Sequence, residues 1–224
     1  MLMPIRRSCA SSTISEIFLQ VDAATPEFLV SEFLDWVVAY LEDGAEIADG
    51  QTLQYGFTLF RCLVQSGKLT LFAPDFRSLP VQWVDDLISA FQLIAAHKYV
   101  PESVALPADI PWLQQTAIVG ERFEELPMFA NRAERSESNK ADSGWFIGSQ
   151  SADVDNNNPE TLRVMSLYEA IILVPQLIPF LSLPAGCSVL FSEGDPVILR
   201  DWVKLEIDPE SYLGRLNRQS RFDI

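Results

Sequence analysis

The spacing of the apolar residues changes along the first hundred residues, and this limits the chain to folds containing both helices and strands. Residues 26–44 and 80–95 carry apolar side chains three and four positions apart, as on one face of an α-helix. Between them, apolar and polar residues alternate over 52–59, which is typical of a strand with one buried face. Ser66 and Gly67 then mark a turn into a return strand over 68–72. The sequence therefore predicts an α+β fold with mostly antiparallel sheet.

Local signals place the ends of the predicted helices. Pro26 stands at a first helical position, and Gly44 is suited to end that helix. Pro80 is expected to open a second helix. A third helix is predicted from Pro159, capped by Asn158. Further short strands are predicted at 115–119, 144–149, 187–191 and 197–205.

A polar segment divides the chain in two. Residues 131–142 contain no large apolar side chain, so they cannot add to a hydrophobic core. We interpret them as an exposed connector between an N-terminal α+β unit over 16–130 and a smaller α+β unit over 143–207. Residues 1–15 are predicted to form a loose tail, and residues 208–224 a C-terminal tail.

The charge of the chain excludes some classes of partner. The sequence has 224 residues, with 31 acidic against 16 basic residues and a net charge of -15. Such a chain repels phosphate, so we expect neither nucleic-acid binding nor docking on anionic lipid, whereas a basic protein would be attracted.

The cysteine pattern and the apolar runs indicate where the protein works. Three widely spaced cysteines predict free thiols in a reducing compartment. No signal peptide is recognised at the N-terminus. The most apolar run, 171–183, is shorter than the roughly 20 residues of a membrane span. We therefore expect a cytoplasmic protein with no membrane contact.

The sequence offers no catalytic motif. Hydrolase, nucleotide-binding and zinc-protease signatures are missing, and the single histidine, His97, follows an apolar helical face, where a structural role is the more common one. Acidic pairs are too frequent in a chain of this charge to indicate acid–base chemistry. We predict no catalytic residues and no enzyme activity.

One segment partly matches a calcium-binding loop. Asp153, Asp155 and Asn157 occupy its first, third and fifth positions, but Asn158 and Val164 stand where the loop needs glycine and glutamate. We therefore predict no metal and no cofactor. Asp153 and Asp155 remain candidates for contact with a protein partner.

An acidic cluster adjoins the predicted end of the first helix. Acids are unfavourable at a helix C-terminus, which carries partial negative charge, so stability alone does not explain the cluster. Two interpretations stay open: a solvated loop, or a surface that meets a basic partner. The cluster comprises Glu42, Asp43, Glu46 and Asp49.

The stretch 143–205 carries a recognisable order of motifs. It begins with Ser-Gly-Trp-Phe-Ile at 143–147, followed by Asn-Asn-Asn-Pro-Glu at 156–160 and Leu-Pro-Ala-Gly at 183–186. This block resembles the immunity protein thirty-three family, whose members occur in bacterial polymorphic toxin systems and are inferred to neutralise a co-encoded toxin. Family members often carry an acidic dipeptide after the first motif, where this chain has Gln150 and Ser151. The family-like structural residues are Gly144, Trp145, Phe146, Asn158, Pro159, Gly186 and Trp202.

The resemblance implies an immunity protein that binds and neutralises a cognate bacterial toxin, and the acidic charge of the chain favours a basic one. Trp145 and Trp202 are expected in the core or at a domain seam, because large aromatic side chains are mostly buried. Gly144 and Gly186 are expected to serve turns. A general protein-binding adaptor or regulatory module is the alternative, followed by a carboxylate-based enzyme.

Overall fold

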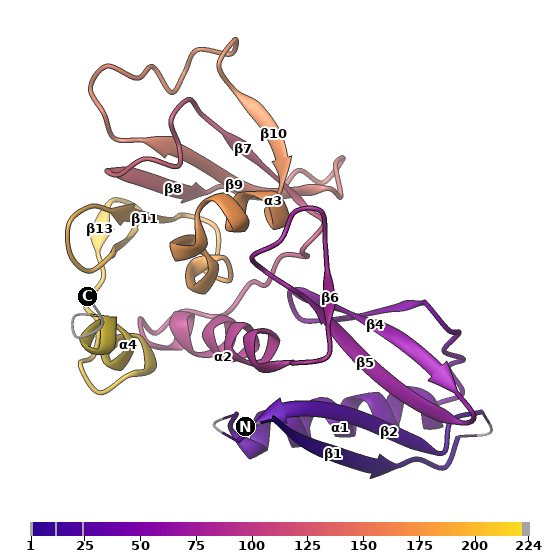
Figure 1. Cartoon of the computed structure of the whole chain (residues 1–224). Helices are drawn as coiled ribbons and strands as arrows, with labels where there is room; N and C mark the ends of the chain where they lie inside the picture. The colour runs from indigo at the N-terminus through magenta and orange to yellow at the C-terminus, as the bar shows by residue number, and fades with distance from the viewer. Residues whose placement is uncertain (1, 12, 24, 221–224) are drawn as a thin grey trace. The chain divides into compact units, whose positions relative to one another are not determined.

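The computed structural model describes residues 2–11, 13–23 and 25–220, and it divides into two compact units. Unit 1 comprises residues 1–95 and unit 2 comprises residues 96–224. The predicted α+β class with mostly antiparallel sheet is confirmed (Figure 1). No helix in the described part of the chain is long and apolar enough to cross a membrane.

The predicted division at 131–142 differs from this arrangement. The segment connects two neighbouring strands of one sheet, β8 (Met128–Arg132) and β9 (Asp142–Ser149), so it is a hairpin connection inside unit 2. Its polar composition fits an exposed loop as well as it fits a linker between domains. The segment also contains a buried residue, Arg132, with a relative exposure of 2%.

Unit 1 consists of a sheet in the order β1-β2-β5-β4-β3, with β6 beside β5. The parallel pair β2–β5 joins antiparallel neighbours. The strands are β1 (Leu2–Ser8), β2 (Glu16–Asp22), β3 (Thr52–Tyr55), β4 (Thr58–Gln65), β5 (Lys68–Pro74) and β6 (Trp83–Val84).

The first helix of unit 1, α1 (Glu27–Glu42), forms where its apolar face predicted it. That face is buried, and the Phe33 ring lies 4.6 Å from the Phe60 ring of β4. The helix ends at Glu42 with Asp43 as its C-cap, and Gly44 takes a φ of 90° as expected for a residue after a helix end.

Three expectations for unit 1 need correction. The segment 1–15 is not wholly a loose tail, because β1 pairs with β2 along its full length; as an exposed edge strand it lacks an apolar pattern. The alternation over 52–59 spans a hairpin that turns at Gly56, where φ is 56°. Helix α2 (Ile88–Glu102) begins eight residues after Pro80, where the Asp86 carboxylate accepts a hydrogen bond from the Ile88 amide at 3.0 Å.

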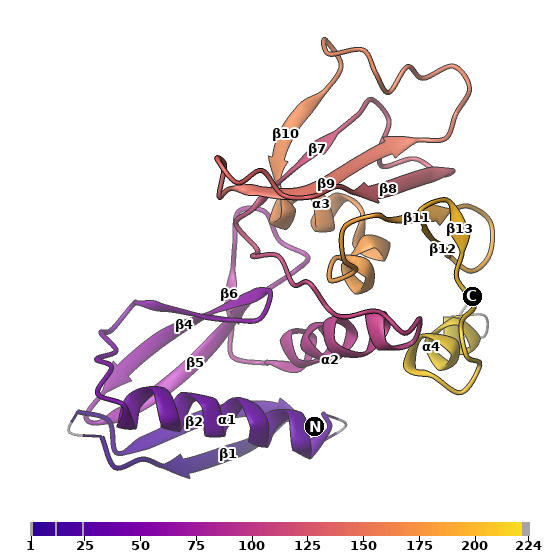
Figure 2. The ribbon, with the colours of Figure 1, turned by 180° about the vertical axis from the view of Figure 1, so that it is seen from behind.

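Unit 2 is built on a sheet in the order β10-β7-β9-β8-β11-β12-β13, in which β7 and β9 are parallel and the other pairs antiparallel. Figures 1 and 2 show α3 and the helical turns after it on one face of this sheet. The remaining elements are β7 (Thr116–Val119), β10 (Arg163–Ser166), α3 (Leu167–Leu173), η1 (Pro175–Phe180), β11 (Cys187–Phe191), β12 (Val197–Arg200), β13 (Val203–Lys204) and α4 (Tyr212–Ser220).

The helix predicted from Pro159 begins later, at Leu167. The Asn158 side chain accepts a hydrogen bond from the Glu160 amide at 3.1 Å and closes a turn, not a helix cap. Ser166 and Glu169 form the capping box of α3, each side chain bonding to the other residue's backbone amide. Reciprocal capping satisfies two helix amides and outweighs the single signal at Asn158.

The C-terminal part of unit 2 is more ordered than predicted. The strand expected over 197–205 is the hairpin β12–β13. Part of the tail forms α4, in which Leu213 is buried and its amide donates to the Ser103 hydroxyl at 3.1 Å. Residues 221–224 of the predicted tail lie outside the described residues.

Candidate functional site

The two faces of the unit 2 sheet differ in what covers them. The face beneath the helices contains side chains that are at most 3% exposed, among them Val119, Met128, Trp145, Val189 and Ile198. On the other face, Val164 of the edge strand β10 lies opposite Ile118 of β7, and Ile118 is in register with Phe146 of β9. Directly paired residues point to the same side of a sheet, so these side chains form one apolar row.

We call this row, together with Phe129, the open face. Val164 is 70% exposed and Ile118 is 43% exposed, although both are β-branched residues suited to burial. Phe146 and Phe129 are half-buried, and their rings stack at 5.9 Å. Partly exposed Leu190 and Val197 continue the row into β11 and β12. A contiguous apolar surface of this kind is typical of a protein interaction site.

The open face borders a strongly acidic region at one end of the sheet. The loops 120–127, 150–162 and 192–196 all leave the sheet at this end, because Val119, Met128, Ser149, Arg163 and Phe191 are aligned there by strand register. Arg122 is the single basic residue in the sequence of these loops. We call their acidic residues the acidic end: Glu121, Glu124, Glu125, Asp153, Asp155, Glu160, Glu193 and Asp195.

Arg122 holds two of these loops together. Its guanidinium lies 2.8 Å from a Glu125 oxygen and 2.9 Å from an Asp153 oxygen. Hydrogen bonds from the Ser151 hydroxyl and from its own amide, together with Arg122, hold the pKa of Asp153 below its usual range. Asp153 is therefore a fixed negative charge at neutral pH.

Gln150 joins the same loops to the ends of the central strands. Its amide nitrogen donates to the carbonyl oxygens of Met128, at 2.5 Å, and Phe191, at 3.2 Å. Its backbone amide donates to the Pro127 carbonyl at 2.9 Å. Sequence analysis placed no role on Gln150, which stands where the resembling family often has an acid.

Asn156 fixes the long loop against the sheet. Its side-chain oxygen accepts from the Ser149 amide at 3.2 Å, and its side-chain nitrogen donates to the Ser149 carbonyl at 2.8 Å. A Cβ atom at Gly148 would lie 2.5 Å from that oxygen, so this approach requires glycine. The sequence signal for this anchor was a pair of glycines, Gly120 and Gly148, near an asparagine-rich loop.

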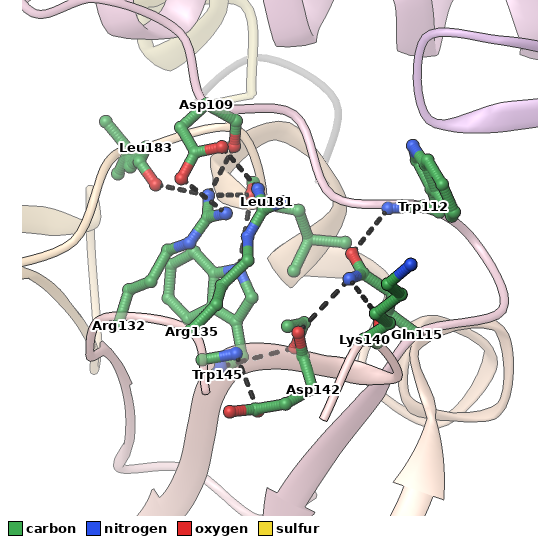
Figure 3. A network of polar contacts seen from close by, with 12 residues as sticks. Asp109, Trp112, Gln115, Arg132, Arg135, Lys140, Asp142, Trp145, Leu181 and Leu183 are labelled. Atoms are coloured by element: carbon green, nitrogen blue, oxygen red, sulfur yellow. Dashed lines mark hydrogen bonds and ion pairs between the residues drawn. The ribbon is translucent and has the colours of Figure 1, made fainter. Parts of the chain in front are cut away.

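A buried cation, Arg132, lies at the opposite end of the sheet, on the face that the helices cover (Figure 3). The Arg132 side chain is 0% exposed and donates to the carbonyl oxygens of Asp109, Leu181 and Leu183. It pairs with the Asp109 carboxylate at 2.9 Å and lies 5.6 Å from the Trp145 ring. Burial lowers its pKa to about 10, so it stays charged at neutral pH. Its hydrogen bonds tie β8 to two loops and make it structural.

His97 is also structural. It is 1% exposed, and Nε2 lies 2.7 Å from the Ile178 carbonyl oxygen. Burial lowers its pKa to about 4, so the ring is neutral at physiological pH. Among the described residues, no group of three or more His, Cys, Asp or Glu side chains is placed to hold a metal ion.

The predicted partner-binding residues lie in both units. Asp153 and Asp155 are part of the acidic end of unit 2. The acidic cluster Glu42, Asp43, Glu46 and Asp49 belongs to unit 1, at the end of α1 and in the loop after it. There the Asp49 carboxylate accepts from the Val64 amide at 3.0 Å, so it also supports β4.

The family-like residues have several roles. Gly144 and Gly186 adopt φ values of 78° and 85°, which glycine tolerates best, and Trp145 is buried as expected. Phe146 belongs to the open face, while Asn158 and Pro159 lie in the loop before β10. Trp202 was expected in a core or seam but is 80% exposed, because it occupies the turn of the β12–β13 hairpin.

Comparison with known proteins finds a similarity for part of the chain. Residues 97–201, just under half of the sequence, match the family model of the Imm33-like domain. The resemblance predicted from 143–205 is confirmed, and the match begins earlier than predicted, two residues after the end of unit 1. It includes every strand that carries the open face and the acidic end. No curated protein and no solved structure matches the chain.

Proposed function

Taking residues 97–201 as an Imm33-like domain, we propose that this chain is an immunity protein that neutralises a co-encoded bacterial toxin by binding it directly. The open face and the acidic end form the contact surface. The observation that carries the proposal is the exposed cross-strand pair Ile118 and Val164 beside a dense group of carboxylates, all within the matched domain.

The two parts of this surface supply different terms of the binding free energy. Apolar side chains that lose water on contact supply affinity, because removing apolar surface from water is favourable. The carboxylates supply speed and selectivity, because an acidic surface steers a basic partner into contact. Because Gln150, Asn156 and Arg122 already hold the loops, little further ordering is needed on binding.

In this proposal the protein inhibits by occupying a surface of the toxin, and it performs no chemistry itself. His97, the single histidine, and the buried Arg132 are both engaged by backbone carbonyls, which supports a structural role for each. The cytoplasm is the proposed site of action, and a basic toxin is the proposed partner because of the net charge of -15.

The proposal is tested with the purified product of the toxin gene next to this one. Cells that express the toxin should survive when this protein is co-expressed, and the two proteins should co-purify in a defined ratio. Replacing Ile118 and Val164 together by serine should lower affinity at least ten-fold. It should leave the fold intact, because both side chains are already exposed. A chain that neither protects cells nor binds this toxin is not its immunity protein.

Charge reversal can show which acidic group faces the toxin. The triple variant Glu121→Lys, Glu124→Lys and Glu160→Lys should associate with the toxin about ten-fold or more slowly than the parent at low salt. Added salt should reduce this difference in association rate. The matched control is the triple variant Glu42→Lys, Asp43→Lys and Glu46→Lys, in which Asp49 is kept because it supports β4. A slower rate for the second set would move the contact surface to unit 1.

A further inference from the structure

The turn between β12 and β13 presents a tryptophan in an unfavourable backbone conformation. Asp201 and Trp202 have φ values of 50° and 67°, as in the two-residue hairpin turns that asparagine and glycine favour. Trp202 is 80% exposed, and its neighbour Val203 is 66% exposed. Trp202, with the largest type of side chain, therefore occupies a backbone conformation that glycine adopts most easily, and little of its side chain is buried.

Hydrogen bonds attach the backbone of the turn to the neighbouring strands. The Asp201 amide donates to the Gly186 carbonyl at 3.1 Å, and the Gly186 amide donates to the Arg132 carbonyl at 2.8 Å. Arg132 is itself fixed by its buried hydrogen bonds. An exposed tryptophan on a backbone held in this way has the properties of an interface hot spot, because little backbone freedom is lost when it inserts into a partner.

The residues around the turn, 200–204, have a small positive net charge, because Arg200 and Lys204 stand against the single acid Asp201, whereas the whole chain has a net charge of -15. Arg200 of β12 and Lys204 of β13 are both exposed. Because Arg200 pairs with Val203 and Lys204 pairs with Leu199, the two bases point to opposite faces of the hairpin, on either side of Trp202 in the chain. Neither forms an ion pair within the described part of the chain. A partner surface that complements this turn is apolar at its centre and acidic at its rim.

We propose that Trp202 inserts into an apolar, acid-rimmed pocket of the toxin; this inference rests on the proposed immunity function. The toxin then contacts the sheet at both ends, with a basic surface against the acidic end and the pocket over Trp202. The ends are separated by β12, four residues or about 13 Å. One interface of standard size, about 800 Å² per partner, covers that span.

The test substitutes Trp202→Gly and measures two quantities. The melting temperature should stay unchanged or rise by up to about 3 °C, because glycine relaxes the positive φ. Affinity for the purified product of the neighbouring toxin gene should fall at least about 30-fold, as for a hot-spot residue. Leu173→Gln is the matched control, since Leu173 is 52% exposed and lies on α3; it should change affinity less than about three-fold.

Charge reversal tests the acidic rim. Arg200→Glu with Lys204→Glu should weaken binding at low salt, even though the protein becomes more acidic. Faster or tighter binding by this variant would show that the turn faces a basic surface, and it would overturn the proposed rim.

The outcomes separate this inference from the proposed function. A lower melting temperature for Trp202→Gly would make Trp202 a packing residue and overturn the inference. Equal toxin affinity of parent and variant would overturn it while the immunity function stands. A parent that does not bind the toxin would remove both. Flotation with phosphatidylserine vesicles that depends on Trp202 would assign the turn to a membrane and also overturn the inference.

Discussion

Replacing Arg132 by methionine should destabilise unit 2 by about 3–5 kcal/mol, as expected when one partner of a buried charge network is removed. Methionine fills similar space but donates no hydrogen bond. The carbonyl oxygens of Asp109 and Leu183 then lose this donor, whereas the Leu181 oxygen still accepts from Trp145 Nε1 at 3.1 Å. Each buried acceptor left unpaired costs about 1–3 kcal/mol. The Asp109 carboxylate is 43% exposed and regains water, so it adds little.

Differential scanning calorimetry at pH 7 measures the effect. For a unit of this size the expected loss corresponds to a melting temperature lower by roughly 10–20 °C. Arg135→Gln is the control, because Arg135 also pairs with Asp109 but its side chain is 32% exposed, so its loss should cost at most about 1 kcal/mol. Arg132→Lys should lie between the two, since the charge remains without the planar fork.

A small change would refute this reasoning. Suppose that the free energy of unfolding of Arg132→Met is within about 1 kcal/mol of the parent value. The carbonyl oxygens then do not depend on the guanidinium, because the cost of burying the cation equals the gain from its hydrogen bonds. Equal effects of Arg132→Met and Arg135→Gln would place the stabilisation in the pairing with Asp109 instead.

Three further predictions concern local structure. Gly148→Ala should lower stability by about 1–3 kcal/mol in urea unfolding, because its Cβ would displace the Asn156 side chain and its two hydrogen bonds; equal unfolding midpoints would contradict the anchor. Burial lowers the pKa of His97 to about 4, so its contribution to the free energy of unfolding is complete above about pH 6.5 and is lost as the pH falls toward about 4. The difference in unfolding free energy between the parent and His97→Gln should therefore narrow over that pH range. A constant difference would show that His97 does not cause the pH dependence. Ser166→Ala should cost about 1 kcal/mol by removing the Glu169 capping box, as measured by thermal unfolding, and an unchanged melting temperature would disprove the cap.

The elements that sequence analysis predicted well share a regular apolar period. Helix α1 has one buried stripe, and the β4–β5 hairpin has a clear turn at Ser66 and Gly67. Both depend on neighbours close in sequence, so a local pattern contains the necessary information. The helix start at Leu167 is also encoded locally, because Ser166 and Glu169 form a reciprocal cap that is stronger than the single signal at Pro159.

The domain boundary and the candidate site could not be found in this way. The boundary between the two units, at residues 95 and 96, lies inside helix α2. No turn residue or polar linker therefore marks the boundary in the sequence. The open face exists because β10 returns to lie beside β7, which places Val164 opposite Ile118, 46 positions earlier in the chain. Trp202 was expected to be buried because of its residue type, whereas its exposure follows from a turn conformation that the sequence does not favour.

The anchors of the long loop before β10 have a consequence for protein engineering. Gln150 and Asn156 attach the loop to the sheet, whereas the exposed carboxylates at Asp153 and Asp155 make no bond to the strands. Attachment to the strands and presentation of the carboxylates are thus assigned to different residues of one segment, although Asp153 also joins it to the loop 120–127 through Arg122. New sequences grafted between Gln150 and Asn156 would leave the hydrogen bonds of both residues to the sheet in place. The loop is therefore a natural position at which to retarget this protein toward a different ligand while retaining the parent fold.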